Sequence, residues 1–245
     1  MRSIFKIAYK MKYQRFLFLF AVIFGFSYII NSLDFSTPFS SALLSATYSY
    51  VDTSSVIAII RILAPSLICI IITAGFFTDD FDIIVLYVFY RTSALKKWFL
   101  LKVFSLLLHI IEFYFIVFFT YGTLFCIIGK RLYIQEIFSI ASLVVFLFSV
   151  LFTFAGVLAV NVFSFIFTSK WSSLLYCLFI GINAALVKTV EKSVYLYILN
   201  PIYNFFIQWH TQLNSVPTFY ERIVGDDGIF TIGFSIKYFL LMSLL

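Results

Sequence analysis

Charged residues are scarce in this chain of 245 residues: they make up 11% of it, against roughly 25% in an ordinary soluble domain. Hydrophobic residues make up 63% instead, and 22% of all residues are aromatic. Apolar runs of about 20 residues, the length that a helix needs to cross a bilayer, recur along the sequence. This composition excludes a soluble globular protein and predicts a polytopic membrane protein.

The sequence also lacks the residues of several kinds of site. Its three cysteines all fall inside apolar runs, so their spacing supports no disulfide framework. HExxH, CxxC and G-x-S-x-G motifs are absent, which leaves a metal centre or a catalytic nucleophile without support. We interpret the net charge of +6 as a consequence of membrane topology and expect no nucleic-acid partner.

A phosphate-binding loop of the form G-x-x-x-x-G-K-[ST] is missing too. The nearest match is Gly129-Lys130, but position 124 is Leu and position 131 is Arg. We therefore expect no cofactor in this chain. If the protein moves cargo against a gradient, ATP and Mg must be bound by a partner chain.

Six apolar runs predict one all-α transmembrane domain over residues 1–245. A cleaved signal peptide is the competing interpretation of the first run, but no A-x-A-like site follows it closely. The fourth run is much longer than a span needs, so we expect it to tilt, to protrude or to break near Gly156. The predicted spans are residues 16–30, 55–77, 103–128, 137–167, 172–187 and 229–245.

The distribution of basic residues predicts the orientation, because cytoplasmic segments near span ends are enriched in Lys and Arg. With the amino terminus inside, ten basic residues fall in inner segments and five in outer segments. We therefore predict a multi-pass protein of the cell membrane with both termini in the cytoplasm.

Two segments outside the spans have amphiphilic patterns. Residues 1–15 place basic and apolar side chains on separate helical stripes, which is typical of a helix in the headgroup layer, although a frayed basic tail is the alternative. Residues 79–90 begin with acidic side chains, continue with an apolar stretch and precede a basic cluster, which favours a short cytoplasmic helix. That helix is either a docking element for a soluble partner or a solvated loop. Its candidate residues are Asp79, Asp80, Phe81, Asp82, Arg91, Lys96 and Lys97.

The outer segment 195–209 is apolar and aromatic, yet it carries Asn200-Pro201 at its middle. Proline removes a helix donor, and bare backbone is tolerated at membrane depth only where protein or a water-filled cavity covers it. Two short half-helices that dip back from the outer face satisfy that constraint. Asn200, Pro201 and Trp209 are therefore candidates for an extracellular gate.

Four ionisable side chains fall inside predicted spans, where charge is costly and marks a candidate functional site. His109 and Glu112 lie one turn apart on the same helix face, and Lys237 reaches a depth similar to that of Glu112. A structural ion pair and a polar patch along a cargo path are both open. Arg61 and Lys237 can instead extend toward the membrane interface.

In the order of these elements, nearly the whole chain resembles the permeases of ABC transporters of the type-2 exporter class. The most similar local pattern is the acidic start at Asp79, followed by Arg91-Thr92-Ser93 and Lys96-Lys97-Trp98. The resemblance implies that residues 1–15 form an interfacial helix, residues 79–90 a coupling helix and residues 195–209 a re-entrant hairpin.

The resemblance also implies a function and partners. Such permeases pair with a second permease copy, here expected to form a homodimer, and bind two copies of a cytoplasmic ATPase. The small size and the abundance of Phe, Ile, Tyr and Lys are similar to those of Gram-positive exporters of membrane-active peptides. Lipid-linked or small hydrophobic cargo is an alternative. A sensor or immunity protein that binds a peptide without transport, and an intramembrane enzyme using Glu112 and His109, are hypotheses from other classes.

Overall fold

A computed structural model describes residues 14–31, 56–79, 95–128, 140–189, 199–205 and 232–244. Within these ranges all regular secondary structure is helical, as the composition predicts. The helices are α2 (Gln14–Asn31), α4 (Val56–Thr73), α6 (Leu95–Ile127), α8 (Ile140–Phe163), α9 (Ser169–Thr189), α11 (Pro201–Phe205) and α13 (Ile232–Leu244).

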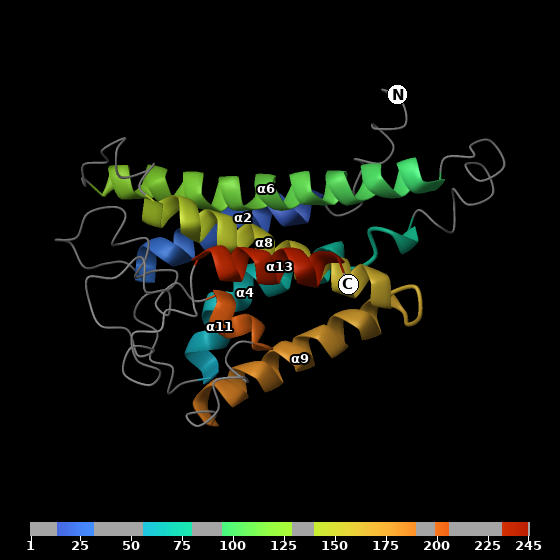
Figure 1. The fold of residues 1–245 in the computed structure, drawn as a ribbon. Helices are drawn as coiled ribbons and strands as arrows, with labels where there is room; N and C mark the ends of the chain where they lie inside the picture. The colour runs from blue at the N-terminus through green and yellow to red at the C-terminus, as the bar shows by residue number, and fades with distance from the viewer. Residues whose placement is uncertain are drawn as a thin grey trace.

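The long helices lie side by side in a bundle, with α6 along one edge and α9 along the opposite edge (Figure 1). Successive long helices alternate in direction. At one end of the bundle α4 and α8 finish while α6 and α9 begin. We call this the inner end, because the sequence predicts that it faces the cytoplasm, and we call the opposite end the outer end.

Within the described ranges, two helices are long and apolar enough to cross a membrane, by length and composition. They are the segments Trp98–Ile127 of α6 and Ser142–Phe163 of α8, with 30 and 22 residues. Gln14–Ile29 and Ile59–Thr73 are shorter apolar helices. The count of six spans stays a prediction, although each predicted run contains a helix in the structure.

Two helix boundaries differ from the sequence-based expectation. Of the three alternatives for the fourth run, a break near Gly156 does not occur, because α8 continues through this residue and ends at Phe163, before a turn that leads to Ser169 and α9. Helix α6 begins at Leu95, so that Lys96 and Lys97 belong to its first turn and not to a loop. At 33 residues α6 is about 50 Å long, which exceeds the roughly 30 Å hydrocarbon layer.

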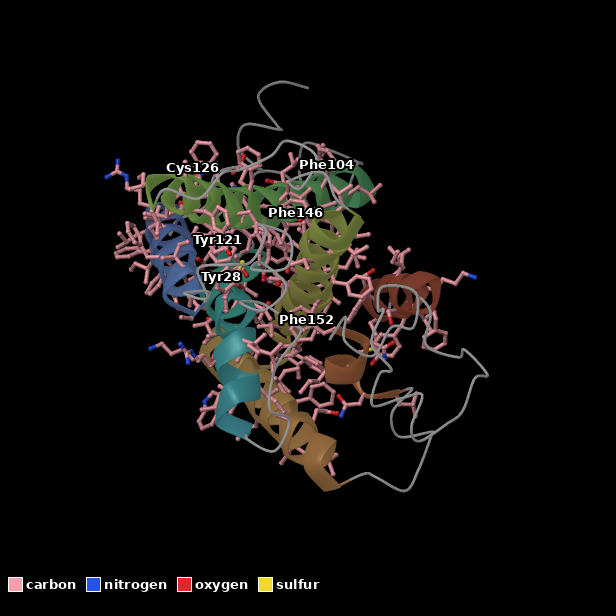
Figure 2. The ribbon with its side chains drawn as sticks, turned by 90° about the vertical axis from the view of Figure 1, so that its left-hand side faces the viewer. Tyr28, Phe104, Tyr121, Cys126, Phe146 and Phe152 are labelled. Atoms are coloured by element: carbon pink, nitrogen blue, oxygen red, sulfur yellow. The ribbon has the colours of Figure 1, made fainter. Side chains whose placement is uncertain are left out.

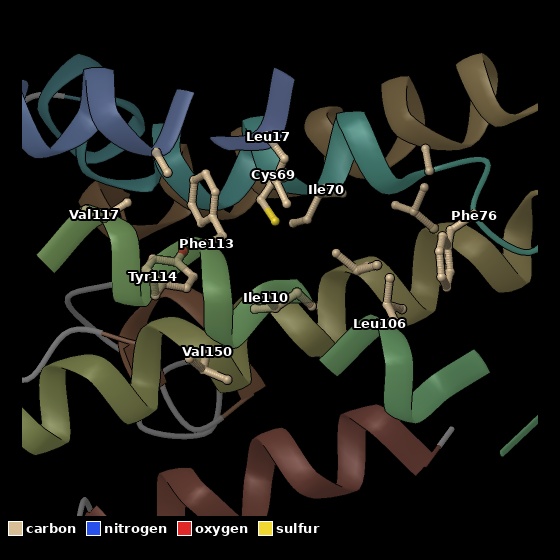
Figure 3. Close-up of a cluster of buried hydrophobic side chains, with 14 of the residues drawn as sticks. Leu17, Cys69, Ile70, Phe76, Leu106, Ile110, Phe113, Tyr114, Val117 and Val150 are labelled. Carbon is tan, nitrogen blue, oxygen red and sulfur yellow. The ribbon is translucent and has the colours of Figure 1, made fainter. Parts of the chain in front are cut away.

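Helix α8 belongs to both hydrophobic clusters of the bundle. One cluster joins α8 to α2, α4 and α6, through Val150 and Val157 among others, and part of it is shown in Figure 3. The other joins α8 to α4, α9, α11 and α13, through residues such as Phe148 and Phe152. Figure 2 shows Phe146 and Phe152 at different levels of this helix. The central position of α8 follows from apolar side chains on nearly all of its faces.

Small residues set two close helix contacts. A Cβ atom added to Gly25 of α2 would lie 2.6 Å from Thr120 Cβ of α6. A Cβ atom added to Gly156 of α8 would lie 2.5 Å from the Tyr176 hydroxyl of α9 and 2.6 Å from Ile70 Cδ1 of α4. A larger side chain there would require the ends of the Tyr176 and Ile70 side chains to shift, so glycine allows α8 to touch α4 and α9 at one level.

Candidate functional site

Asn161 of α8 ties the inner end of α4 to α8. Its Nδ2 donates to the Thr73 carbonyl at 2.9 Å and to the Val157 carbonyl of its own helix at 2.9 Å. Its Oδ1 accepts from the Phe77 backbone N–H at 3.1 Å. Since α4 ends at Thr73, the Thr73 carbonyl has no donor four residues on within the helix; it accepts from the Phe76 N–H at 3.1 Å, and the buried Asn161 amide adds a second donor there and accepts the Phe77 N–H beyond the helix end.

Lys102 of α6 holds the same end of α4 from a second side. Its side chain is completely buried, and its Nζ donates to the Phe76 carbonyl at 3.4 Å. The ammonium group also lies 3.9 Å from the centre of the Phe76 ring. A cation near the carboxyl end of a helix and over an aromatic face is favoured electrostatically. We call Thr73, Phe76, Phe77, Lys102 and Asn161 together the inner junction.

The predicted pair of His109 and Glu112 lies on α6 next to the inner junction. His109 Nδ1 is 3.4 Å from Glu112 Oε2, as their spacing of one turn predicts. The His109 ring is fully buried and packs edge to face on Phe76 at 6.0 Å, whereas the Glu112 side chain is 38% exposed. This polar pair is therefore continuous with the aromatic packing around Lys102.

A chain of three hydroxyl groups crosses the middle of the bundle. Tyr114 Oη of α6 lies 2.7 Å from Ser66 Oγ of α4 and 2.7 Å from Thr153 Oγ1 of α8. All three side chains are buried. Hydroxyl groups that bond across helices hold them together where lipid offers no alternative partner.

Short helix α11 is held by polar contacts toward the outer end. Asn200 precedes it, accepts the Ile202 N–H on Oδ1 at 2.9 Å, and donates from Nδ2 to the Asn183 carbonyl of α9 at 3.2 Å. Asn204 Nδ2 donates to the Asn200 carbonyl at 3.1 Å. Asparagine is a preferred residue before a helix, and Pro201 at the first position lacks only a donor that the helix does not use.

Helix α13 contacts the same element. Ser235 Oγ donates to Asn204 Oδ1 at 2.9 Å, and Tyr238 Oη donates to the Leu199 carbonyl at 2.7 Å. We call Leu199, Asn200, Asn204, Ser235 and Tyr238 the outer hub. Its polar contacts satisfy the backbone at the kink that the sequence predicts around Asn200-Pro201.

Only part of the predicted docking segment is described. Asp79 is exposed just beyond α4, and its backbone N–H donates to the Gly75 carbonyl at 2.8 Å. Lys96 and Lys97 lie in the first turn of α6. Asp80, Phe81, Asp82 and Arg91 lie outside the described residues, as do Trp209 and most of the predicted interfacial helix.

The remaining candidate charges are not brought together. Arg61 is exposed on α4, and Lys237 is exposed on α13. Helix α13 packs on α8 and α11, whereas Glu112 is paired with His109 within α6. Among the described residues, no ion pair links Lys237 to Glu112.

Several residues that join the helices are not among the site residues that the sequence predicts. Asn161 is the most polar side chain within the long fourth run, which was a usable signal because buried amides are costly in an apolar environment. Lys102 follows Lys96 and Lys97 closely in the sequence, where a basic residue favours the cytoplasmic face, but the structure buries it. The partners of Tyr114, Ser235 and Asn204 are distant in sequence, so no spacing pattern reveals them.

The described residues contain no group of three or more His, Cys, Asp or Glu side chains that would hold a metal ion. Comparisons of the chain with family models, with curated proteins and with solved structures gave no match. The fold therefore defines a class only: a protein whose described part is all-helical and contains two helices long and apolar enough to span a membrane.

Proposed function

We propose that this chain is the permease subunit of an ATP-driven ABC exporter in the cell membrane of a Gram-positive bacterium. Two copies of the chain form the membrane part, and two copies of a cytoplasmic ATPase bind at the inner end. The ATPase subunits bind ATP and Mg and hydrolyse the nucleotide. The cargo is an amphipathic, membrane-active peptide.

One observation carries this proposal: the end of α4 that leads directly into the acidic segment 79–82 is tied to two other helices. Asn161 binds it to α8, and Lys102 binds it to α6. A partner that docks on residues 79–97 would thus act on three helices at once, instead of on a loose loop. The sequence order that resembles type-2 permeases supports the same assignment.

In this proposal, alternating access is a population shift between two arrangements of the permease dimer. If ATP binding draws the two ATPase subunits together, the two permease bundles rock, and the dimer cavity opens to one side or the other. Helix α11 and the outer hub close the outer side of the bundle in this scheme. The 34 phenylalanines and 16 tyrosines favour an apolar cargo surface.

The test is purification of the chain from its native membrane. We expect an ATPase to co-purify with the wild type and to be lost at least tenfold from the variant Asp80→Lys/Asp82→Lys. The matched control, Asp226→Lys/Asp227→Lys, makes the same charge change in a predicted outer loop and should retain the ATPase.

Three outcomes contradict the proposal. No ATPase accompanies the wild-type chain, or the inner variant retains a cargo-stimulated ATPase, or the outer control loses it as fully. If the chain bound a peptide without an associated ATPase, and substitutions in residues 79–97 left that binding unchanged, the sensor or immunity protein would be favoured.

A further inference from the structure

Helix α8 contacts both the inner junction and α11 on one continuous element. Near its inner end, Asn161 holds the exit of α4. Nine residues earlier, Phe152 packs on Phe205 of α11, with ring centroids 4.6 Å apart, and on Phe239 of α13 at 5.9 Å. At 1.5 Å per residue, these two points on α8 are about 14 Å apart.

The next residue adds a third contact at the same level. Thr153 Oγ1 lies 2.7 Å from the Tyr114 hydroxyl, which also bonds Ser66 of α4. Figure 3 shows Tyr114 among the buried side chains of α4, α6 and α8. Helix α4 is therefore joined to α8 twice, at its exit and near its middle.

We infer that α8 is a rigid connecting rod that transmits displacement of the α4 exit to α11. Asn161 is the positioning residue that joins the α4 exit to α8. Phe152 is the contact through which a displacement of α8 reaches α11. The significance of this rod for transport rests on the proposed function, but the mechanical connection does not.

Energetics favour joint movement over separation. If the α4 exit moved alone, the Phe77 N–H would lose its partner in a buried environment, and the Thr73 carbonyl would keep only the bond from the Phe76 N–H. Each unsatisfied backbone group costs about 1–3 kcal/mol. Because α8 is helical from Ile140 to Phe163 without a break, a displacement at Asn161 reaches Phe152.

Hydrogen exchange of the purified full chain in lipid nanodiscs, without any ATPase, tests this inference. In the variant Asn161→Leu we expect amide exchange to accelerate at least fivefold at residues 74–79 and also at residues 202–205. Exchange in α2 should stay unchanged, because a general loss of stability would accelerate it as well. The control Ser173→Ala removes a partly buried bond within α9 and should change neither region.

Coupling between two sites is reciprocal, so a change at Phe152 should also affect the α4 exit. Phe152→Ala should accelerate exchange at residues 202–205 and, by a smaller factor, at Phe77. If Asn161→Leu does not fold, Asn161→Gln keeps an amide and should give a smaller effect in the same two regions.

If amide exchange accelerated at residues 74–79 but did not change at residues 202–205, the inference would be wrong, and Asn161 would act only as a local cap of α4. Unchanged exchange in both regions, or equal acceleration in α2, would overturn it too. None of these outcomes bears on whether an ATPase co-purifies, so the inference and the proposed function fail separately.

Discussion

The inner junction and the outer hub both supply hydrogen-bond partners to backbone groups at helix ends, but they do so with different side chains. Each satisfies backbone groups at an interrupted helix, and each relies on asparagine. The inner junction adds a completely buried lysine and holds one end of α4, a helix of 18 residues. The outer hub consists of neutral groups and holds α11, which has five residues.

This difference indicates which end is stiffer. A helix of five residues has almost no stability of its own, so α11 depends on its neighbours for its conformation. The end of α4 extends a long helix and is bound from two sides. We therefore expect the inner junction to move as a unit with α6 and α8, and the outer hub to rearrange more readily.

The largest effect should come from the contact that joins α8 to the outer hub. Phe152→Ala removes a buried ring packed on Phe205 and Phe239 and should lower the free energy of unfolding by about 3 kcal/mol. Unfolding in mixed micelles measures this change. The control Phe115→Ala truncates a ring that is 63% exposed and should cost less than about 0.5 kcal/mol. Equal losses would show that Phe152 has no special role.

A smaller effect should separate the two glycines of α8 and α9. Gly156→Ala places a methyl group against the side-chain ends of Tyr176 and Ile70 and should destabilise by about 2 kcal/mol, because both side chains must shift within a packed site. Gly181→Ala meets nothing within 4 Å and should be neutral or stabilise by up to about 1 kcal/mol, since alanine favours helix. The same unfolding measurement applies. A tolerated Gly156→Ala would contradict the close packing of α8.

The smallest effect should distinguish the hydroxyl chain from the outer hub. Tyr114→Phe leaves Ser66 and Thr153 without their shared partner in the buried middle of the bundle and should cost about 1.5 kcal/mol. Tyr238→Phe removes an exposed bond from a partly buried side chain and should cost about 0.5 kcal/mol. If the order were reversed, the outer hub would be the more tightly held region.

The sequence predicts the helical class and the places of the apolar runs well, because hydropathy and length act locally. It also predicts the pair of His109 and Glu112, since one turn of helix brings them together. The sequence predicts helix ends less well. Helix α6 begins eight residues before the expected span, because Lys96 and Lys97 continue the helix beyond the apolar run. Asn161 and Lys102 act on residues 26 to 88 positions away, and only tertiary packing reveals such contacts.

Accessibility from the two sides of the membrane tests the central claim most directly, namely that the inner and outer ends lie on opposite faces of a bilayer. Asp79→Cys and Trp209→Cys are introduced separately into a chain in which Cys69, Cys126 and Cys177 are replaced by Ala. With an impermeant maleimide, we expect Trp209→Cys to react in intact cells and Asp79→Cys to react only after permeabilisation. Reaction of both residues in intact cells, or of Asp79→Cys alone, would contradict the account.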